Sequence, residues 1–209
     1  MATPTFQEIQ AAMTGFPRTL AWTNFRSVQT SLSPPHEAMT SASYNSTGWR
    51  VALVKGEYRI TGARVNVVLN ANSSWATPSA RTSTALLTHE QGHFDITGLI
   101  ARDIISQMLS LSWDEAVVAA LRGVGNSPQA RINWVTQEFQ KEVNRIGREA
   151  KAALDRLQTD PVTKQDGIYD TQTNHSQNTT AQAAWDTRLQ QAKINNTNFQ
   201  LDLKLAGIL

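Results

Sequence analysis

Apolar residues recur at three- and four-residue spacing in the middle of the chain. The run covers residues 85–104, and the positions that share one face are Ala85, Leu86, His89, His93, Ile96, Ile100 and Ile104. This period is typical of a helix with one buried face. The pattern therefore predicts a long helix whose buried face carries two histidines.

A different pattern precedes this helix. Three short runs rich in β-branched residues, at 51–54, 58–60 and 65–69, are separated by glycine-containing turns. They predict three strands of a small mixed or antiparallel sheet in the N-terminal half. Before them, Thr5-Phe6-Gln7-Glu8 fits a capping box that opens a short helix.

The C-terminal half is predicted to be mainly helical. Ser112-Trp113-Asp114-Glu115 fits a second capping box, and the apolar positions between 129 and 158 predict a long helix with a charged outer face. A polar connection at 161–177 leads to a shorter helix that contains Trp185. Residues 199–205 alternate strictly between apolar and polar, which predicts a half-exposed strand. We expect an α+β fold in which residues 1–209 form a single domain.

Composition narrows the function classes. The chain has 209 residues, 40% of them hydrophobic, and a net charge of +2 without a concentrated basic stripe, so no nucleic-acid partner is expected. The chain has no cysteine, so any metal ligands must be nitrogen and oxygen atoms. We expect a monomer that does not associate with membranes, because no apolar run is long enough to span one. Residues 1–20 lack the pattern of a secretory signal, which leaves the compartment open, export of a mature form included.

The candidate chemistry lies in the sequence His89-Glu90-Gln91-Gly92-His93, within the predicted helix. Two histidines four residues apart share a helical face and are able to bind one zinc ion (Zn²⁺). Glu90, between them, is placed to act as the general base that activates a water. This arrangement is typical of zinc metallopeptidases.

A catalytic zinc ion usually takes three protein ligands, so a third must come from elsewhere in the chain. His175 is the favoured candidate, because it lies in a turn-rich segment and follows Tyr169-Asp170, a pair of groups suited to a site. Glu115 is the alternative, although the predicted capping box already gives it a role.

Other positions are set aside as ligands. Asp95 lies two residues after His93, about 200° around the helix, and is expected to be a supporting or structural carboxylate. Ile96 and Leu99 stand where the extended metzincin pattern needs glycine and histidine, which excludes that class. His36 lies in a Ser-Pro-Pro loop and is expected to be a surface residue.

Three blocks of the chain together resemble the signature of a bacterial family of predicted zinc-dependent proteases, catalogued chiefly as a domain of unknown function. The blocks are Leu20-Ala21-Trp22-Thr23-Asn24-Phe25, residues 86–96, and Tyr169-Asp170-Thr171-Gln172-Thr173-Asn174-His175 followed by Gln182 and Trp185. They span most of the chain in the order of that family. Two positions depart from it: Asn24 stands where an aspartate is common, and Ser176 where a glycine is usual.

The resemblance implies a zincin-like fold in which His89, His93 and His175 hold zinc and Glu90 is the general base. It also suggests that Tyr169 donates a hydrogen bond to the developing oxyanion. The alternative for Tyr169 is an ordinary aromatic residue that packs at the edge of a loop.

The predicted function is hydrolysis of a peptide bond in a peptide or protein substrate by a zinc-activated water. An extended substrate is expected to pair with a sheet edge near residues 70–75. Two alternatives stay open: a zinc-binding interaction module without catalysis, and a zinc hydrolase that acts on amides or esters other than a protein backbone.

Overall fold

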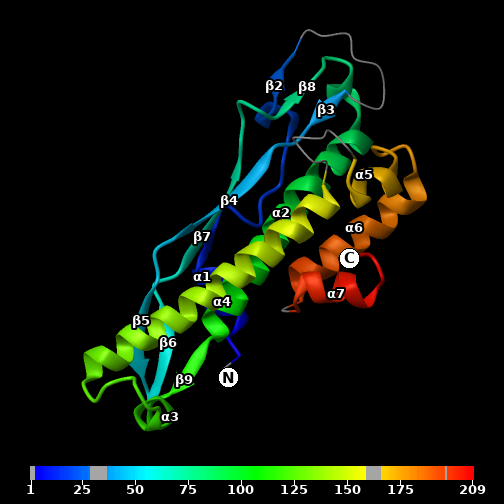
Figure 1. Ribbon diagram of the computed structural model, residues 1–209. Coiled ribbons are helices and arrows are strands. Elements are labelled where there is room, and N and C mark those ends of the chain that lie inside the picture. Colours follow the sequence, from blue (N-terminus) through cyan, green and yellow to red (C-terminus); the bar gives the residue numbers. More distant parts are fainter. Residues whose placement is uncertain (1–2, 29–36, 159–165, 196) are drawn as a thin grey trace.

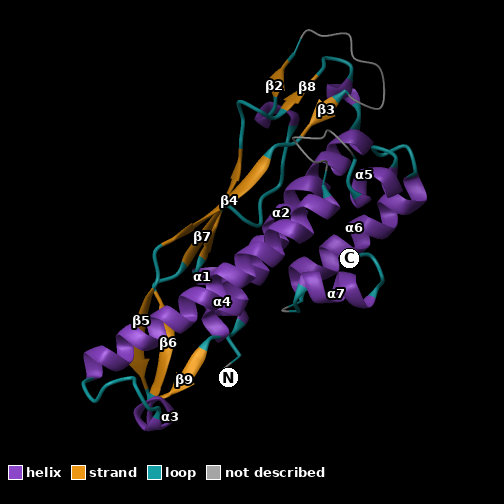
Figure 2. Cartoon of the chain, viewed as in Figure 1, coloured by secondary structure: helices purple, strands orange, loops and turns teal. Residues whose placement is uncertain are grey.

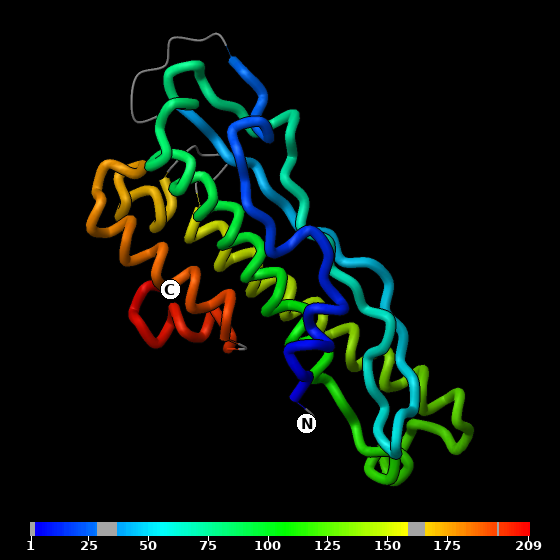
Figure 3. Tube along the Cα trace, turned by 180° about the vertical axis from the view of Figure 1, so that it is seen from behind, coloured from blue at the N-terminus to red at the C-terminus, as the bar shows by residue number. Residues whose placement is uncertain are grey.

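Two long helices, α2 (Thr84–Ser110) and α4 (Pro128–Leu157), lie against each other along the length of the molecule (Figure 1). The computed structural model describes residues 3–28, 37–158, 166–195 and 197–209. Helix α2 is central, because strands pack on one of its sides and α6 and α7 on the other, as Figure 3 shows from behind. Its side chains are therefore buried over most of its length.

The described strands form three separate three-stranded sheets (Figure 2). The first has the order β1-β7-β4 and the second β2-β8-β3, and both are mixed; the third, β5-β6-β9, is antiparallel. The strands are β1 (Met13–Thr14), β2 (Arg26–Ser27), β3 (Ala38–Met39), β4 (Ala42–Thr47), β5 (Arg50–Val54), β6 (Glu57–Thr61), β7 (Arg64–Leu69), β8 (Trp75–Ala76) and β9 (Ser112–Asp114).

The remaining helices are short apart from α6. They are α1 (Phe6–Ala11), the 3₁₀ turns η1 (Trp22–Asn24) and η2 (Ala80–Thr82), α3 (Glu115–Ala120), α5 (Ile168–Thr173), α6 (Thr179–Ile194) and α7 (Phe199–Leu205). Helices α5, α6 and α7 gather on the same side of the molecule, where α6 and α7 pack on α2 and α5 packs on α4 and α6 (Figure 1). Within the described ranges, no helix combines the length and the apolar character needed to cross a membrane.

Much of the expected α+β architecture is confirmed. The three predicted strands appear as β5, β6 and β7, and the helices predicted at 85–104 and 129–158 appear as α2 and α4. The capping box at Thr5 is present, with Glu8 bonded back to the Thr5 backbone. On β7, Val65, Val67 and Leu69 alternate inward, and the strand packs on α2.

The expectation of one small N-terminal sheet is wrong in two respects. There are three sheets, and β9, which completes the third, follows α2 in the sequence. Residues 112–114 of the predicted capping box instead form this strand, which pairs with β6 so that Trp113 lies opposite Tyr58. Asp114, not Ser112, then caps α3 by accepting from the backbone N–H groups of Ala116 and Val117.

The predicted strand at 199–205 is also wrong, because these residues form helix α7. The first N–H groups of α7 have no acceptor within the helix and are hydrogen-bonded by other groups. The Asp103 carboxylate accepts from the backbone N–H groups of Phe199 and Gln200, and the Asn198 side chain caps the helix. The buried residues are Phe199, Gln200 and Leu203, whereas Leu201 is 52% exposed. The alternation in sequence therefore does not match the alternation in burial that a strand requires.

The expected substrate-binding edge at 70–75 is not a free edge. Residues 70–74 form a turn, in which Ser73 and Ser74 donate backbone hydrogen bonds to the Asn70 carbonyl. Trp75 then begins β8, whose two neighbours, β2 and β3, flank it on both sides. No side of β8 is left for a substrate strand.

Candidate metal centre

His89 and His93 lie one turn apart on α2 and direct their Nε2 atoms toward the same point. The helix begins at an N-cap, Ser83, whose hydroxyl accepts from the Leu86 backbone. The two Nε2 atoms are 3.2 Å apart. The side chain of His89 is 1% exposed and that of His93 is 11% exposed. The spacing that predicted a shared face therefore brings the two imidazoles together in a largely dry environment.

The third atom at this point is Oδ1 of Asp170, from α5. It lies 3.1 Å from His89 Nε2 and 2.9 Å from His93 Nε2, and the Asp170 side chain is 1% exposed. Gly167, just before α5, allows this approach, since a Cβ there would lie 2.4 Å from the backbone oxygen of Gln158 at the end of α4. The helix order thus brings together residues that are 77 or more positions apart in sequence.

The three atoms form a group that is able to bind a metal ion. Ligand atoms placed tetrahedrally about 2.0–2.1 Å from a zinc ion are about 3.3 Å from one another. The distances in the group are within a few tenths of an ångström of this value. Two imidazole nitrogens and one carboxylate oxygen converge here, and a cation at their centre satisfies all three.

The electrostatics of the group favour positive charge. Burial acts to lower the pKa of His93, but the charge and hydrogen bond of Asp170, with smaller contributions from Glu90 and Asp166, raise it above its ordinary value. A proton on His93 and a metal ion are therefore stabilised by the same negative charges.

Glu90 lies on α2 beside this group and is 3% exposed. Its Oε2 atom is buried, and no group in the described part of the chain donates a hydrogen bond to it. A buried acceptor without a partner costs about 1–3 kcal/mol, and more if it is charged. Such a cost at a site that also holds a metal-binding group is typical of a functional residue rather than a structural one.

Tyr169 packs tightly against both histidines. Its ring stacks on that of His89 with centroids 4.8 Å apart and meets the His93 ring edge-on. Its hydroxyl donates to the backbone carbonyl of His89 and accepts from Gln182, and the side chain is fully buried. Burial, above all, raises the pKa of this hydroxyl. The geometry thus favours the packing alternative for Tyr169 over the oxyanion role.

His175 lies next to the group. Its Nδ1 is 3.7 Å from Asp170 Oδ1, its Nε2 is 3.1 Å from Asp166 Oδ2, and its ring centroid is 5.8 Å from that of His89. Asn174, His175 and Ser176 all have positive φ, of 46°, 48° and 76°. This left-handed turn favours glycine, the residue that the resembling family has at the Ser176 position. That His175 is itself a metal ligand stays a prediction.

The other residues considered from the sequence lie as follows. Glu115 begins α3, beyond the far end of α2 and about 26 Å along that helix from His93, so it is too distant to be a ligand. Asp95 accepts hydrogen bonds from Gln91 and Lys193, as a structural carboxylate would. His36 falls outside the described residues.

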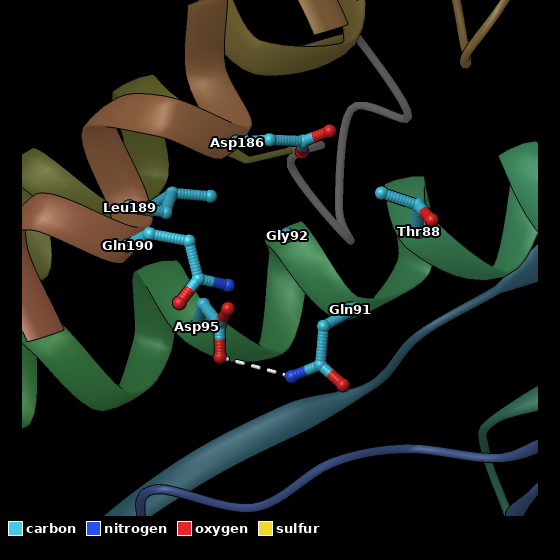
Figure 4. A pocket seen from close by; sticks show the side chains of 7 residues that line it. All are labelled: Thr88, Gln91, Gly92, Asp95, Asp186, Leu189 and Gln190. Carbon is cyan, nitrogen blue, oxygen red and sulfur yellow. Dashed lines mark hydrogen bonds between the residues drawn. The ribbon is translucent and has the colours of Figure 1, made fainter. Parts of the chain in front are cut away.

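A pocket of about 210 Å³ lies between α2 and α6 and is bordered by Gly92 (Figure 4). Thr88, Gln91, Gly92 and Asp95 of α2 face Asp186, Leu189 and Gln190 of α6 across it. Most of its lining residues are polar. Two of them adjoin residues of the centre: Gly92 lies against the Tyr169 hydroxyl, and Asp186 accepts a hydrogen bond from Gln182.

Two contributors to the centre were missed by reasoning from the sequence. The sequence marks Asp170 as one of a pair of groups suited to a site but not as a ligand, and Gln182 only as a residue after the third block, yet Gln182 bonds directly to the His89 ring. The Tyr-Asp pair in a polar segment was the only available signal for Asp170. Comparison with protein-family models, with curated proteins and with solved structures finds no match to this chain, so its family membership stays a prediction and the metal-binding group rests on geometry.

Proposed function

We propose that the protein is a zinc-dependent peptidase with a zincin-like centre, in which His89, His93 and Asp170 hold the metal ion and Glu90 carries protons. The observation on which this proposal depends is the buried Oε2 of Glu90, which lacks a donor among the described residues and lies beside the three converging ligand atoms. A purely structural carboxylate would be paired.

The donor set suits zinc. Two imidazole nitrogens and one carboxylate oxygen form a mixed, three-ligand set of the type that catalytic zinc sites use. A zinc ion held there supplies Lewis acidity, which polarises a carbonyl group and makes water more acidic. Within the described residues the group has three protein ligands, the number with which catalytic zinc sites keep a fourth position for water or substrate.

Glu90 supplies the proton transfers of the reaction. Its free Oε2 accepts a proton from the water whose oxygen attacks the peptide carbonyl carbon. The same carboxyl then gives that proton to the amide nitrogen as the C–N bond breaks, so that an amine and a carboxylic acid are released.

Tyr169 takes a positioning role in this proposal. Its single hydrogen is donated to the His89 carbonyl, and its ring stacks on the His89 imidazole. It therefore fixes the orientation of one ligand and carries Asp170, the next residue in α5. Gly92 is required beside it, because a Cβ at that position would lie 2.0 Å from the Tyr169 hydroxyl.

The test is cleavage of an unfolded protein by the zinc-loaded chain, read by mass spectrometry. Glu90→Gln keeps the size of the side chain and removes its basicity, and we expect it to bind zinc equally and to lose at least about 100-fold in rate. Glu142→Gln, an exposed position on α4, serves as the control and should keep full activity. Equal cleavage by wild type and Glu90→Gln at equal zinc content would refute the assignment of Glu90. Absence of cleavage by wild type would refute a general peptidase.

A second candidate function is a metal-stabilised binding module without catalysis, and the position of His175 favours it. The 3.7 Å between its Nδ1 and Asp170 Oδ1 is close to a ligand-to-ligand spacing. A fourth protein ligand closes a zinc site and removes the position for substrate. In that case His175→Ala weakens zinc binding as strongly as Asp170→Ala does, whereas the peptidase proposal expects a much smaller effect.

A further inference from the structure

Gln182, on α6, connects the metal centre to a surface carboxylate through a chain of hydrogen bonds. Its side-chain oxygen lies 3.1 Å from His89 Nδ1. Its amide nitrogen lies 2.8 Å from the Tyr169 hydroxyl and 2.8 Å from Asp186 Oδ1. Gln182 is 6% exposed, so these contacts decide how its amide group is oriented.

The partners of the Gln182 amide allow only one orientation. The Tyr169 hydroxyl has a single hydrogen, which it donates to the His89 carbonyl, so toward Gln182 it can only accept. The Asp186 carboxylate has no hydrogen to donate. Both contacts therefore require the NH₂ group of Gln182, and its carbonyl oxygen must face His89.

The orientation of Gln182 fixes the tautomer of His89. A carbonyl oxygen is only an acceptor, so His89 Nδ1 must carry the hydrogen. Thr173 gives the same answer independently: its hydroxyl donates to the Tyr169 backbone carbonyl at 2.7 Å and lies 3.3 Å from His89 Nδ1, toward which it can only accept. With the hydrogen on Nδ1, the lone pair of the neutral imidazole is on Nε2, the atom that faces His93 and Asp170.

We infer that Gln182 and Asp186 are positioning residues that hold His89 ready for metal binding, with Asp186 orienting the Gln182 amide and Gln182 selecting the Nδ1–H tautomer. The inference rests on the proposed metal-binding function and extends it beyond the ligands. Asp186 borders the pocket between α2 and α6, where it stays partly accessible to water (Figure 4). A charge can therefore be kept at this end of the chain of bonds without the full cost of burial.

The first measurement needs no metal. Two-dimensional ¹H–¹⁵N spectra of the histidine side chains in the metal-free protein report which nitrogens of His89 carry a hydrogen. We expect a hydrogen on Nδ1 in wild type and in Gln182→Glu, whose carboxylate still accepts from Nδ1. Without metal, a second hydrogen on Nε2 is compatible with the inference, because Asp170 Oδ1 lies 3.1 Å from that atom. A dominant Nε2–H tautomer in wild type overturns the inference, whether or not the protein binds zinc.

The second measurement is the zinc dissociation constant, obtained by competition with a chromophoric chelator. Loss of a hydrogen-bond partner behind a ligand histidine usually weakens metal binding about 10–100-fold, which is the effect expected for Gln182→Leu. Asp186→Ala should weaken binding at least about 3-fold, because the Gln182 amide loses one of its two acceptors. Gln200→Leu is the matched control, since Gln200 is also 6% exposed but lies on α7, and it should change the constant by less than about 3-fold.

The two proposals fail in different ways. If folded Gln182→Leu has the same zinc dissociation constant as Gln200→Leu, the positioning role is overturned, but the metal site is not. An unchanged constant for Asp186→Ala removes Asp186 from the inference. If wild type binds no zinc, the proposed function fails, and the tautomer measured in the metal-free protein still decides whether Gln182 orients His89.

Discussion

Replacement of Gly92 by alanine tests the packing on which the whole centre depends. A Cβ at this position of α2 would lie 2.0 Å from the Tyr169 hydroxyl oxygen and 2.5 Å from the ring carbon that bears it. Tyr169 has no room to retreat, because it is fully buried and also packs edge-on against Trp185. The substitution therefore forces Tyr169, and the neighbouring Asp170, away from α2.

The expected loss in the free energy of unfolding has three contributions. Overpacking in a core costs about 1–3 kcal/mol, and the two hydrogen bonds of the Tyr169 hydroxyl contribute about 1 kcal/mol each. Alanine gains about 1 kcal/mol over glycine inside a helix. We expect Gly92→Ala to lower the free energy of unfolding by about 2–4 kcal/mol. Urea unfolding of the metal-free protein, followed by circular dichroism, measures this change.

Gly147→Ala on α4 provides the matched control. A Cβ at Gly147 meets no atom within 4 Å, so only the helix propensity remains and stability should rise by about 0.5–1 kcal/mol. In a Tyr169→Leu background, Gly92→Ala should lower the free energy of unfolding by at least about 1 kcal/mol less than it does in wild type, because the clashing atoms are gone. Gly92→Ala that stabilises the protein as Gly147→Ala does would refute the packing of Tyr169 on α2, and with it the placement of Asp170.

Three further predictions concern the metal centre and its surroundings. Asp170→Ala should weaken zinc binding at least about 100-fold in chelator competition, and His175→Ala less than about 10-fold; the reverse order would exchange their roles. Ser176→Gly should raise the free energy of unfolding by about 0.5–1 kcal/mol, because Ser176 has a φ of 76°, and a loss of stability would contradict the left-handed turn. Burial raises the pKa of Asp103 from 3.8 to about 6 against its hydrogen bonds from Gln200 and Phe199, so the folded protein keeps a proton that the unfolded chain loses near pH 4. The resulting stabilisation of wild type relative to Asp103→Asn is therefore complete below about pH 4, and it falls by about 2–3 kcal/mol as the pH rises to about 6. Urea unfolding of both proteins at several pH values measures this difference in the free energy of unfolding. A difference that does not change with pH would contradict the prediction.

Local features of this fold follow from the sequence, whereas features that depend on distant residues do not. The strands β5, β6 and β7 were predicted because each has its own alternation and its own glycine turn. Residues 199–205 were assigned wrongly, because their alternation also fits a helix once Asp103, 96 residues away from Phe199, supplies the acceptors for its first N–H groups. Likewise, the sequence at 112–115 predicts a helix cap, whereas pairing with β6 makes residues 112–114 a strand.

By itself, the sequence determined the part of the centre that lies within one turn of helix. The spacing of His89 and His93 and the apolar face of α2 are local, since helical geometry alone puts residues four apart side by side. The third ligand atom, the tautomer of His89 and the burial of Glu90 are not local, because they depend on where α5 and α6 pack on α2. Only the tertiary structure brings Asp170 and Gln182 to His89, across 81 and 93 residues, since the packing of distant helices is set by many weak contacts at once rather than by any short pattern.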